Sequence, residues 1–566
     1  MRRAALLCLI CLVLVAPALA VELWVDPVRG DDGRSGFAEN EAVRTLAEAW
    51  SRIPEGSPLT EPYRIRLAAG TYSRDLVPPG GWLAGRHGTT LAPVAIEPAG
   101  DGPVVLPELD LFDCHHVTLR NLTIAGGAGG GNVLHLASCT NISVRGCRLL
   151  GEGDVEGYAG PQEVYKANQC RDLTIQDSEV AHASGTVLDL VAVEGASISR
   201  NRIHHALDWC AYAKGGSAGI RFEANEVWDG RAGGIAAGQG TGFEYMVPPR
   251  VHFESTGVRI VNNIIHDCNG AGLGVHGSSN VLLAYNTLYR VGAASHVIEA
   301  VHGSRSCDGD ADTCRRYLAL GGWGTASGGF EAIPNRNVYI LNNLVVNPGG
   351  AGSTWSQFRI AGPVTPPVGS NIPSPSFADE HLMIRGNVIL NGPIDHPLGL
   401  EDSRLDPVTV LRDNAINTLN PVLVDPESGN FRPVHASFAG VPVAPLAPFP
   451  DDDPVLSPAE PPGMLGNTVP VDRDGAPRSG RDVPGALLSL ASQPLAMPGA
   501  TGVPQDSDGD GQYEDVNGNG RKDFADVVLF FDRMTWIAAN EPVAAFDING
   551  NGRIDFADVV ALFNRL

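Results

Sequence analysis

The sequence has little positive charge and little charge of any kind. Among its 566 residues, 40 Lys and Arg face 64 Asp and Glu, which gives a formal net charge of −24, and charged residues make up only 18%. So acidic a chain is repelled by nucleic acids and by anionic membrane surfaces, and we expect neither as a partner. An anionic polymer is a suitable ligand only if a cation intervenes. The composition favours an exported protein in salty or calcium-bearing surroundings.

Long apolar runs are also missing, with one exception at the N-terminus. Arg2 and Arg3 precede an apolar run over residues 4–15, and the small-residue phrase Ala18-Leu19-Ala20 follows it. This order predicts a secretory signal peptide over residues 1–20. The run is shorter than the roughly 20 apolar residues that a membrane-spanning helix needs. We therefore expect a secreted chain, extracellular or attached to a cell surface, with no membrane span after cleavage.

Helix formers such as Ala, Glu and Lys are scarce over a long central stretch, where a repeating phrase takes their place. Between Ile198 and Leu288 it reads ASISRNRIHHA, GIRFEANEVWDG, GVRIVNNIIHDC and VLLAYNTLYRVG. Apolar residues alternate in each phrase, which indicates a strand, and an Asn ends the run. The equivalent positions along the whole chain are Cys147, Ser178, Asn201, Asn225, Asn263, Asn286, Asn343, Asn387 and Asn414.

These equivalent positions recur at intervals of 23 to 57 residues. A unit of nearly constant minimum length with irregular insertions predicts the rungs of a parallel β-solenoid, in which side chains stack from rung to rung. An inward Asn at one corner of every rung can bond the backbone and its neighbours. We therefore expect a structural Asn ladder, without a catalytic role.

The repeats resemble those of right-handed parallel β-helix proteins, the pectate-lyase-like superfamily. The resemblance covers Val21 to about Leu488, with an opening cap at about 21–75 and a closing segment at about 420–488. The opening phrase is WVDPVRGDDGRSGFAENEAVRTLAEAW, and the closing phrases are NPVLVDPESGNFRPVHASFAG and VDRDGAPRSGRDVPGAL. The resemblance implies an all-β solenoid. Its members include lyases, hydrolases, epimerases and adhesins, so the fold alone does not define the function.

Cysteines stack in the predicted solenoid and also flank one insertion. Cys139 and Cys170 each lie eight residues before a ladder position, so we expect them on adjacent rungs, with Cys114 in the same column. Adjacent strands lie about 4.8 Å apart, which is within disulfide range. The column predicts either disulfides or buried free thiols. Cys307 and Cys314 bracket the tip of an insertion and are the pair that we expect to be bonded.

The composition changes after a Pro/Ala-rich linker at 489–504. DVNGNGRKDFADVVLFF and DINGNGRIDFADVVALF begin at Asp515 and Asp547, 32 residues apart. Oxygen ligands at loop positions 1, 3, 5, 7, 9 and 12, with Gly at position 6, are what Ca²⁺ needs. The predicted ligands are Asp515, Asn517, Asn519, the carbonyl of Arg521, Asp523 and Asp526, and then Asp547, Asn549, Asn551, the carbonyl of Arg553, Asp555 and Asp558.

Two such loops, each followed by a single helix, resemble a dockerin. The resemblance implies a small α-helical, EF-hand-like domain over 505–566 that attaches the chain to a cohesin. The alternative is a calcium-stiffened cap or cell-surface tether. Loop positions 10 and 11 are Phe524-Ala525 and Phe556-Ala557 where many dockerins have hydroxyl residues. The phrase DSDGDGQYED just upstream resembles a thrombospondin type 3 calcium stretch, which implies further calcium ligands at Asp506, Asp508 and Asp510.

Two groups of side chains are candidates for chemistry or sugar binding. Glu194, Lys214, His276 and His302 lie in the similar phrases VEGAS, AKGGS, VHGSS and VHGSR, so we expect them in one sector of neighbouring rungs. The longest insertions follow Asn225, Asn286 and Asn343, which predicts a groove beside the central rungs. A second group lies three residues after successive ladder positions and consists of rings. These rings could stack on sugars or cover a sheet edge. The group contains Trp228, His266 and Tyr289, and with His302 these are the predicted substrate-binding residues.

β-Elimination of a uronate needs a base and a cation that neutralises the substrate carboxylate. The phrase LDWCAYAKGGSAGIRFEANEVWDG resembles the region around the base Lys in calcium-dependent lyases of the superfamily. The resemblance implies Lys214 as base and Asp208 and Asp229 as calcium ligands, although DGRAGGI stands where paired acids are expected. We therefore predict a calcium-dependent polysaccharide lyase.

Two other functions remain open. A glycoside hydrolase would use two carboxylates, from among Glu194, Asp189 and Asp208, although the NTD, DD and GHG phrases of polygalacturonase-like enzymes are absent. The other hypothesis is a non-catalytic cell-surface or carbohydrate-binding protein.

Overall fold

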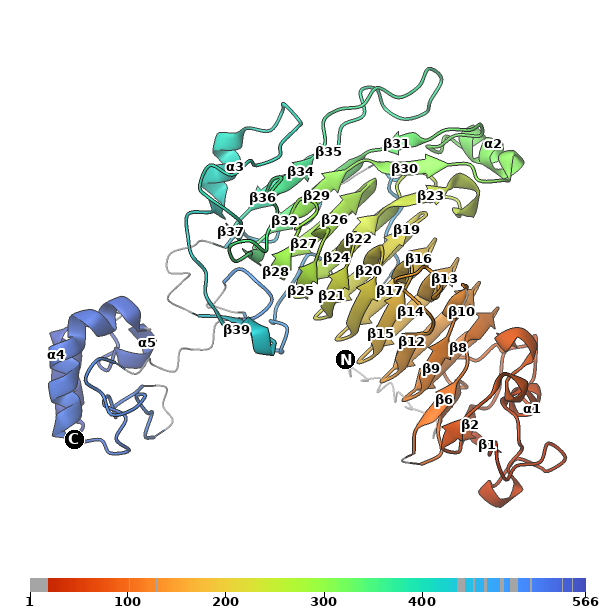
Figure 1. Cartoon of the computed structure of the whole chain (residues 1–566), viewed down its shortest axis with the longest axis horizontal. Coiled ribbons are helices and arrows are strands. Elements are labelled where there is room, and N and C mark those ends of the chain that lie inside the picture. The colour runs from red at the N-terminus through yellow and green to blue at the C-terminus, as the bar shows by residue number, and fades with distance from the viewer. Residues whose placement is uncertain are drawn as a thin grey trace, which may run out of the picture.

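The computed structural model describes residues 19–566 except 101, 129, 435–442, 451–452, 463–465, 479–482, 489–496, 509–511, 542 and 552. Most of the predicted signal peptide, half of the predicted linker and Asp510 lie outside the described residues. The chain winds into a long coil of strands, and a small helical body follows near the C-terminus (Figure 1).

Three parallel sheets form the sides of the coil. Sheet A contains β1 (Val21–Val25), β2 (Tyr63–Leu67), β5 (Val94–Pro98), β8 (His115–Arg120), β11 (Thr140–Arg145), β14 (Arg171–Gln176), β17 (Glu194–Ser199), β20 (Ser217–Glu223), β24 (Ser255–Val261), β27 (Ser278–Ala284), β32 (Asn335–Leu341), β35 (Asp379–Glu380) and β36 (Met383–Arg385). Sheet B contains β3 (Gly70–Thr71), β6 (Val104–Leu106), β9 (Thr123–Gly126), β12 (Arg148–Gly151), β15 (Glu179–Ala183), β18 (Arg202–Ala206), β21 (Glu226–Gly230), β25 (Ile264–Cys268), β28 (Thr287–Val291), β33 (Leu344–Val346), β37 (Val388–Leu390) and β38 (Ala415–Ile416). Sheet C contains β4 (Trp82–Ala84), β7 (Leu109–Phe112), β10 (Asn132–Ala137), β13 (Glu163–Asn168), β16 (Thr186–Val191), β19 (Trp209–Lys214), β22 (Gly233–Gly238), β26 (Ala271–His276), β29 (Ile298–Val301) and β34 (Phe358–Ile360).

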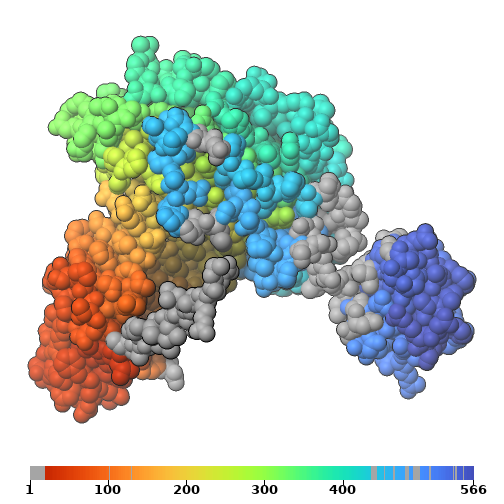
Figure 2. Space-filling model, turned by 180° about the vertical axis from the view of Figure 1, so that it is seen from behind, coloured from red at the N-terminus to blue at the C-terminus, as the bar shows by residue number. Residues whose placement is uncertain are grey.

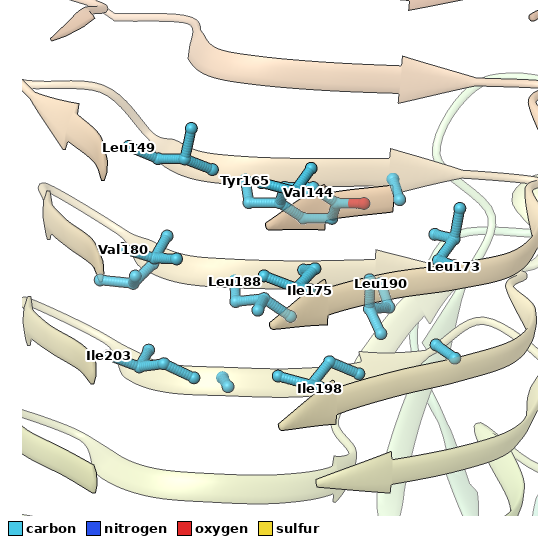
Figure 3. Close-up of a cluster of buried hydrophobic side chains, with 14 of the residues drawn as sticks. Val144, Leu149, Tyr165, Leu173, Ile175, Val180, Leu188, Leu190, Ile198 and Ile203 are labelled. Carbon is cyan, nitrogen blue, oxygen red and sulfur yellow. The ribbon is translucent and has the colours of Figure 1, made fainter. Parts of the chain in front are cut away.

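The core lies inside the coil and consists of stacked apolar side chains. Leu149, Val180 and Ile203 occupy the same position on three successive rungs of sheet B (Figure 3). Side chains alternate along a strand, so every second residue faces inward, and the apolar half of each repeat becomes the core. Burying one such Leu, Ile or Val stabilises the fold by about 1.5–3 kcal/mol.

The predicted Asn ladder is confirmed. The N–H of Asn225 donates to Oδ1 of Asn263, and the N–H of Asn263 donates to Oδ1 of Asn286, both at 3.0 Å. The same bond continues to Asn414 at one end and, through Ser178, to the N–H of Cys147 at the other. The residue before each ladder Asn from Asn201 to Asn343 has a φ between 55° and 59°. This sharp bend turns a backbone N–H away from the sheets, and the Asn side chain satisfies it.

The cysteine predictions have two different outcomes. The disulfide between Cys307 and Cys314 is present, as predicted. The stacked column consists of buried free thiols instead of disulfides. The N–H of Cys114 donates to Sγ of Cys139 at 3.5 Å, and the N–H of Cys139 donates to Sγ of Cys170 at 3.4 Å. The thiols therefore act like the Asn ladder at another corner of the coil.

The coil begins at a cap and carries one helical insertion. At the N-terminal end lie η1 (Glu39–Glu41), α1 (Leu46–Ser51), η2 (Arg74–Leu76) and η3 (Pro79–Gly81). Thr45 caps α1 by accepting from the Glu48 N–H. Insertions between the central rungs form η4 (Phe243–Tyr245), α2 (Ala311–Ala319) and a small sheet, which we call the wall sheet, of β23 (Gly240–Gly242), β30 (Gly303–Ser306) and β31 (Glu331–Ile333).

After the last rungs the chain turns back along the coil. α3 (Pro407–Asp413) and η5 (Pro426–Ser428) accompany a hairpin of β39 (Leu423–Asp425) and β40 (Asn430–Pro433). Described residues between 443 and 478 then run over the outer face of sheet A (Figure 2), where Asn262 and Ser279 bond Val471 and Ser457. The chain then reaches sheet B, where the N–H of Ala486 donates to Thr287. The closing segment therefore lies along the outside of the solenoid.

The C-terminal body consists of α4 (Phe524–Asn540), α5 (Val543–Phe546) and α6 (Phe556–Asn564). It has an apolar core of its own, centred on Phe530, Ile537, Phe546 and Leu562. Asp523 and Asp555 start α4 and α6 with matching capping boxes, in which the third helical residue is Asp526 or Asp558. The repeated loop sequences thus fold into repeated structures.

Candidate functional site

Polar side chains gather on the outer face of sheet C. Lys166, Asp189 and Tyr212 occupy one column on three successive rungs. Lys214 belongs to the neighbouring column of outward-facing residues. Ala213 pairs with Ala237 and Gly238 pairs with His276, so Gly238 follows Lys214 in this column and His276 lies two rungs from Lys214. Two rungs correspond to roughly 10 Å. The middle member of this second column is Gly238, and the side chain of the next residue, Gln239, contacts Lys214 and lines a pocket with His276.

Lys214 lies in a web of polar contacts. Its Nζ is 3.3 Å from the Tyr212 hydroxyl, 3.4 Å from Oε1 of Gln239 and 3.9 Å from Oδ2 of Asp189. The Lys side chain is 14% exposed and that of Asp189 is fully buried. Burial raises the pKa of Tyr212 well above its usual value, so the hydroxyl keeps its proton. The amine is thus held in one position and still reaches the surface.

Asp189 holds a second lysine beside the first. Lys166 donates to Asp189 and, at 3.0 Å, to Glu163. Burial acts to lower the pKa of Lys166, but the two carboxylates raise it overall. Oδ1 of Asp189 is buried and accepts no hydrogen bond from the residues that the structure describes. A buried acceptor of this kind favours a donor from a ligand.

His276 lies at the other end of this column. Its Nε2 is 3.4 Å from Oε2 of Glu299. Burial acts to raise the pKa of Glu299, but hydrogen bonding and the charge of His276 lower it overall. The Trp209 ring meets the His276 ring edge to face at 5.3 Å. A side chain at Gly274 would come within 2.6 Å of that indole, so the glycine allows the indole to lie flat on the sheet.

A pocket of about 390 Å³ opens next to His276 under the wall sheet. Its lining includes Gln239, His276, Glu299, His302, Ser304 and Phe330. A buried pair fixes the wall: Arg305 donates twice to Oε1 of Glu254, at 2.8 and 2.5 Å. Oε2 of Glu254 accepts from the Gly215 N–H at 3.1 Å, directly after Lys214. The insertions therefore connect to the turn that carries Lys214.

Not every predicted site residue lies on this face. Glu194 begins β17 of sheet A and pairs with Arg171 and Arg250, each at 3.2 Å. The prediction that it shares a sector with Lys214 is therefore wrong, because one more bend separates the two positions. Asp208 does lie at the start of β19, where Thr186 donates to it at 3.5 Å. Burial raises its pKa.

The predicted group of rings lies on sheet B, around a corner from Lys214. Trp228 stacks on His266 with centroids 5.5 Å apart. Tyr289 is 5% exposed and bonds Glu427, while the Phe431 ring covers it at 5.8 Å. The hairpin of β39 and β40 thus covers Tyr289, which corrects the prediction that Tyr289 binds sugar. His266 is similarly enclosed, since the Phe431 ring stacks on it at 4.9 Å.

The acidic pair expected for a catalytic Ca²⁺ does not form. Asp208 is buried beside Thr186, whereas Asp229 lies half exposed on β21 of sheet B, 3.4 Å from His205. Sequence reasoning also missed Tyr212, Gln239 and Glu299. One signal was available for this face: the chain has only three lysines, Lys166, Lys214 and Lys522, and two of them lie here.

The two C-terminal loops present the oxygens of a Ca²⁺ site. In the first, Asp515 accepts from the N–H groups of Asn519 and Gly520, and Asp526 accepts from those of Asn517 and Asp523. The second loop repeats these bonds where it is described. Burial raises the pKa of Asp526, and the charges of Asp515 and Asp523 add to this effect. Converging carboxylates of this kind fit a divalent cation.

The predicted upstream stretch contributes a further acidic group. Asp506 and Asp508 lie with Glu514 so that one oxygen from each is within 4.8 Å of the others. Glu514 is fully buried, and its Oε1 accepts no hydrogen bond within the described part of the chain. Asp510 lies outside that part.

Comparisons with known proteins agree with these two bodies. Residues 163–307 match the family model described as the right handed beta helix region, and residues 513–566 match the Dockerin type I domain. The protein is therefore a right-handed parallel β-helix followed by a dockerin type I domain. Dockerin type I domains bind calcium. No protein with a curated function matches the sequence.

Several solved structures align with this chain at low sequence identity. A rhamnogalacturonan lyase aligns with 69% of this chain and 98% of its own, at 10% identity and a TM-score of 0.38. The pectate lyase Pel9A aligns with 59% of this chain and 78% of its own, at 12% identity and a TM-score of 0.33. XylC in complex with xylose aligns with 83% of this chain and 98% of its own, at 9% identity and a TM-score of 0.41. Likeness at this level carries no argument about activity.

The part of the chain that the structure describes holds no helix long and apolar enough to span a membrane.

Proposed function

We propose that the β-helix binds a uronate-containing polysaccharide on the outer face of sheet C and cleaves it by β-elimination. The observation that carries this proposal is that Lys214 and His276 lie in one column of sheet C, two rungs apart, with Gln239 contacting Lys214 and lining the pocket beside His276. The side chains of Lys214 and His276 are largely buried but reach the surface. Isolated solvated residues would not have such fixed partners.

In the proposed reaction Lys214 is the base. It takes the proton next to the uronate carboxylate while the bond to the leaving oxygen breaks and a carbon–carbon double bond forms. Gln239 and Tyr212 hold the amine in position through bonds of 3.4 and 3.3 Å. His276, oriented by Glu299, gives a proton to the leaving oxygen.

The test is a screen of acidic polysaccharides for unsaturated products, which absorb in the ultraviolet. The assay is run with and without added Ca²⁺, because elimination also needs positive charge at the substrate carboxylate. We expect activity on one uronate polymer, its loss in Lys214→Ala, and its retention in Lys522→Ala. Unchanged product formation in Lys214→Ala would remove this residue from the mechanism.

A glycoside hydrolase is the second candidate, and Asp208 favours it. Its raised pKa is a property of a general acid, and Asp189 lies nearby as a second carboxylate. Hydrolysis would produce new reducing ends without ultraviolet absorbance. Loss of those ends in Asp208→Asn, with no absorbance from the wild-type protein, would replace the lyase proposal.

We further propose that the protein is secreted and that the C-terminal domain attaches it to a cohesin. α4 and α6 expose an aromatic face, in which Phe524 meets Phe563 at 6.1 Å and Phe531 meets Phe556 at 5.8 Å. These four rings are 53–60% exposed. They occupy equivalent places in the two repeats, and exposed apolar surface of this extent is typical of an interaction site.

A partner for this face needs an apolar surface, since Phe replaces the hydroxyl residue at position 10. The test is binding of the calcium-loaded protein to a panel of purified cohesins. We expect binding to be lost in the double variant Phe524→Ser, Phe556→Ser and kept in Lys522→Ala. Binding by no cohesin would favour the tether alternative.

We also propose that Ca²⁺ binds both loops through the ligands predicted from the sequence, and that Asp506, Asp508 and Glu514 hold one further ion. The buried, unpaired oxygen of Glu514 supports this third position. Calcium stoichiometry by calorimetry tests it, because Glu514→Gln should bind one ion fewer than the wild-type protein.

A further inference from the structure

Three side chains of metal-ligand type meet at a corner of the first rungs, well away from the rungs of Lys214. His87 follows β4, Asp113 lies in the turn between β7 and β8, and His115 is the first residue of β8. His87 pairs with His115 in an isolated parallel bridge, so the two residues occupy the same place on successive rungs. The coil thus brings together residues that are 28 positions apart in the sequence.

The rung spacing sets the geometry of this corner. The two imidazole rings stack with centroids 4.4 Å apart and planes at 14°. Nε2 of His87 is 3.0 Å from Oδ2 of Asp113, and Nε2 of His115 is 3.6 Å from Oδ1. One ligand atom from each of the three residues lies within 4.8 Å of the others. Tetrahedral bonds of about 2.0–2.1 Å place two ligand atoms about 3.3 Å apart, and the His–Asp separations of 3.0 and 3.6 Å are close to this value.

The corner is accessible and its rings are suited to a cation. The side chains of His87, His115 and Asp113 are 19%, 36% and 47% exposed. A neutral imidazole offers a nitrogen lone pair and is the form that binds metal ions. Asp113 supplies the negative charge. His116 is the next residue along β8, but it is not part of the group.

We propose that His87, Asp113 and His115 bind a divalent transition metal ion of the Zn²⁺ type, with solvent in the remaining position. Two imidazoles and one carboxylate favour such an ion over Ca²⁺ or Mg²⁺, which prefer oxygen ligands. Bound there, the ion would connect the loop after β4 to the turn before β8. The proposal does not depend on the proposed lyase activity.

The experiment uses the full chain with saturating Ca²⁺, so that the C-terminal loops are occupied. Zn²⁺ is titrated against a chromophoric chelator near pH 7, and metal retained after desalting is measured by mass spectrometry. We expect one tightly held Zn²⁺. His115→Gln and His87→Gln should each weaken binding by at least about 100-fold, because loss of even an indirect partner costs about 10–100-fold. His116→Gln is the matched control and should bind like the wild-type protein.

Two results would overturn the proposal. One is the absence of Zn²⁺ binding by the folded wild-type protein. The other is equal Zn²⁺ affinity in wild type, His87→Gln and His115→Gln. That result would assign the metal elsewhere, for example to His182, His204 and His205, whose rings lie 4.6–5.7 Å from one another. Circular dichroism checks that each variant is folded, and Asp113→Asn provides a third variant in which both rings remain.

Discussion

The buried pair of Arg305 and Glu254 connects the wall sheet to both sides of the proposed site. The N–H of Glu254 donates to the carbonyl of Gly277, which follows His276, and its carbonyl accepts from Gly216, two residues after Lys214. Both side chains of the pair are fully buried. Arg305→Met removes the charge and keeps most of the volume, so this substitution tests the link.

The expected cost follows from the bonds that are lost. Arg305 makes two hydrogen bonds to Glu254 and one, at 2.5 Å, to the carbonyl of Trp323. At about 1.5–3 kcal/mol for each bond with a charged group, the sum has an upper bound of about 9 kcal/mol. Because Glu254 keeps its bonds to Gly215 and Thr241, we expect the 3–5 kcal/mol typical of breaking a buried pair.

The assay is denaturant unfolding followed by tryptophan fluorescence. The matched control is Arg315→Met in α2, whose ion pair with Asp312 is exposed and should contribute less than about 1 kcal/mol. The double variant Glu254→Gln, Arg305→Met should recover part of the loss, because no charge is then left buried alone. A cost below about 1 kcal/mol for Arg305→Met would refute the reasoning.

Three further predictions concern the ladder, the calcium loops and a buried histidine. Asn263→Ala leaves the backbone N–H of Asn225 and one of its two side-chain N–H groups without an acceptor. At about 1–3 kcal/mol per buried group the coil should lose about 2–6 kcal/mol in denaturant unfolding, and equal stability would contradict this. Removal of Ca²⁺ by a chelator should melt α4 and α6 in far-ultraviolet circular dichroism while the strand signal stays, and a spectrum that does not change would contradict calcium-dependent folding. Burial, with the charge of His205, lowers the pKa of His204 to about 4. The unfolded chain therefore takes up a proton first, and stability should fall by about 3 kcal/mol as pH drops from about 6.5 to about 4. This part of the pH dependence should be absent in His204→Gln.

The ladder and the calcium loops were predictable because each repeats with a fixed local pattern. Every ladder Asn, from Asn201 to Asn414, follows an apolar alternation, and its role depends only on the rung above or below. The loops after Asp515 and Asp547 likewise need only residues close in sequence. The disulfide between Cys307 and Cys314 spans a separation of seven residues.

The site was less predictable because it depends on which side of the coil a residue faces. Glu194 and Lys214 lie in similar phrases, yet Glu194 begins a sheet A strand and Lys214 ends a sheet C strand. Tyr289 appeared available for sugars, but the hairpin that covers it comes from residues more than 130 positions later. Such coverage depends on the path of the returning chain, which repeat patterns do not encode.

The presence of only three lysines permits a direct test of where the polysaccharide binds. A lysine-selective reagent is applied with and without the polymer found in the activity screen, and modification is followed by peptide mass spectrometry. If the polymer lies over Gly238, Lys214 is protected while Lys522 in the C-terminal domain reacts at an unchanged rate. Equal modification of Lys214 with and without saturating polymer would contradict a binding site on this face of sheet C.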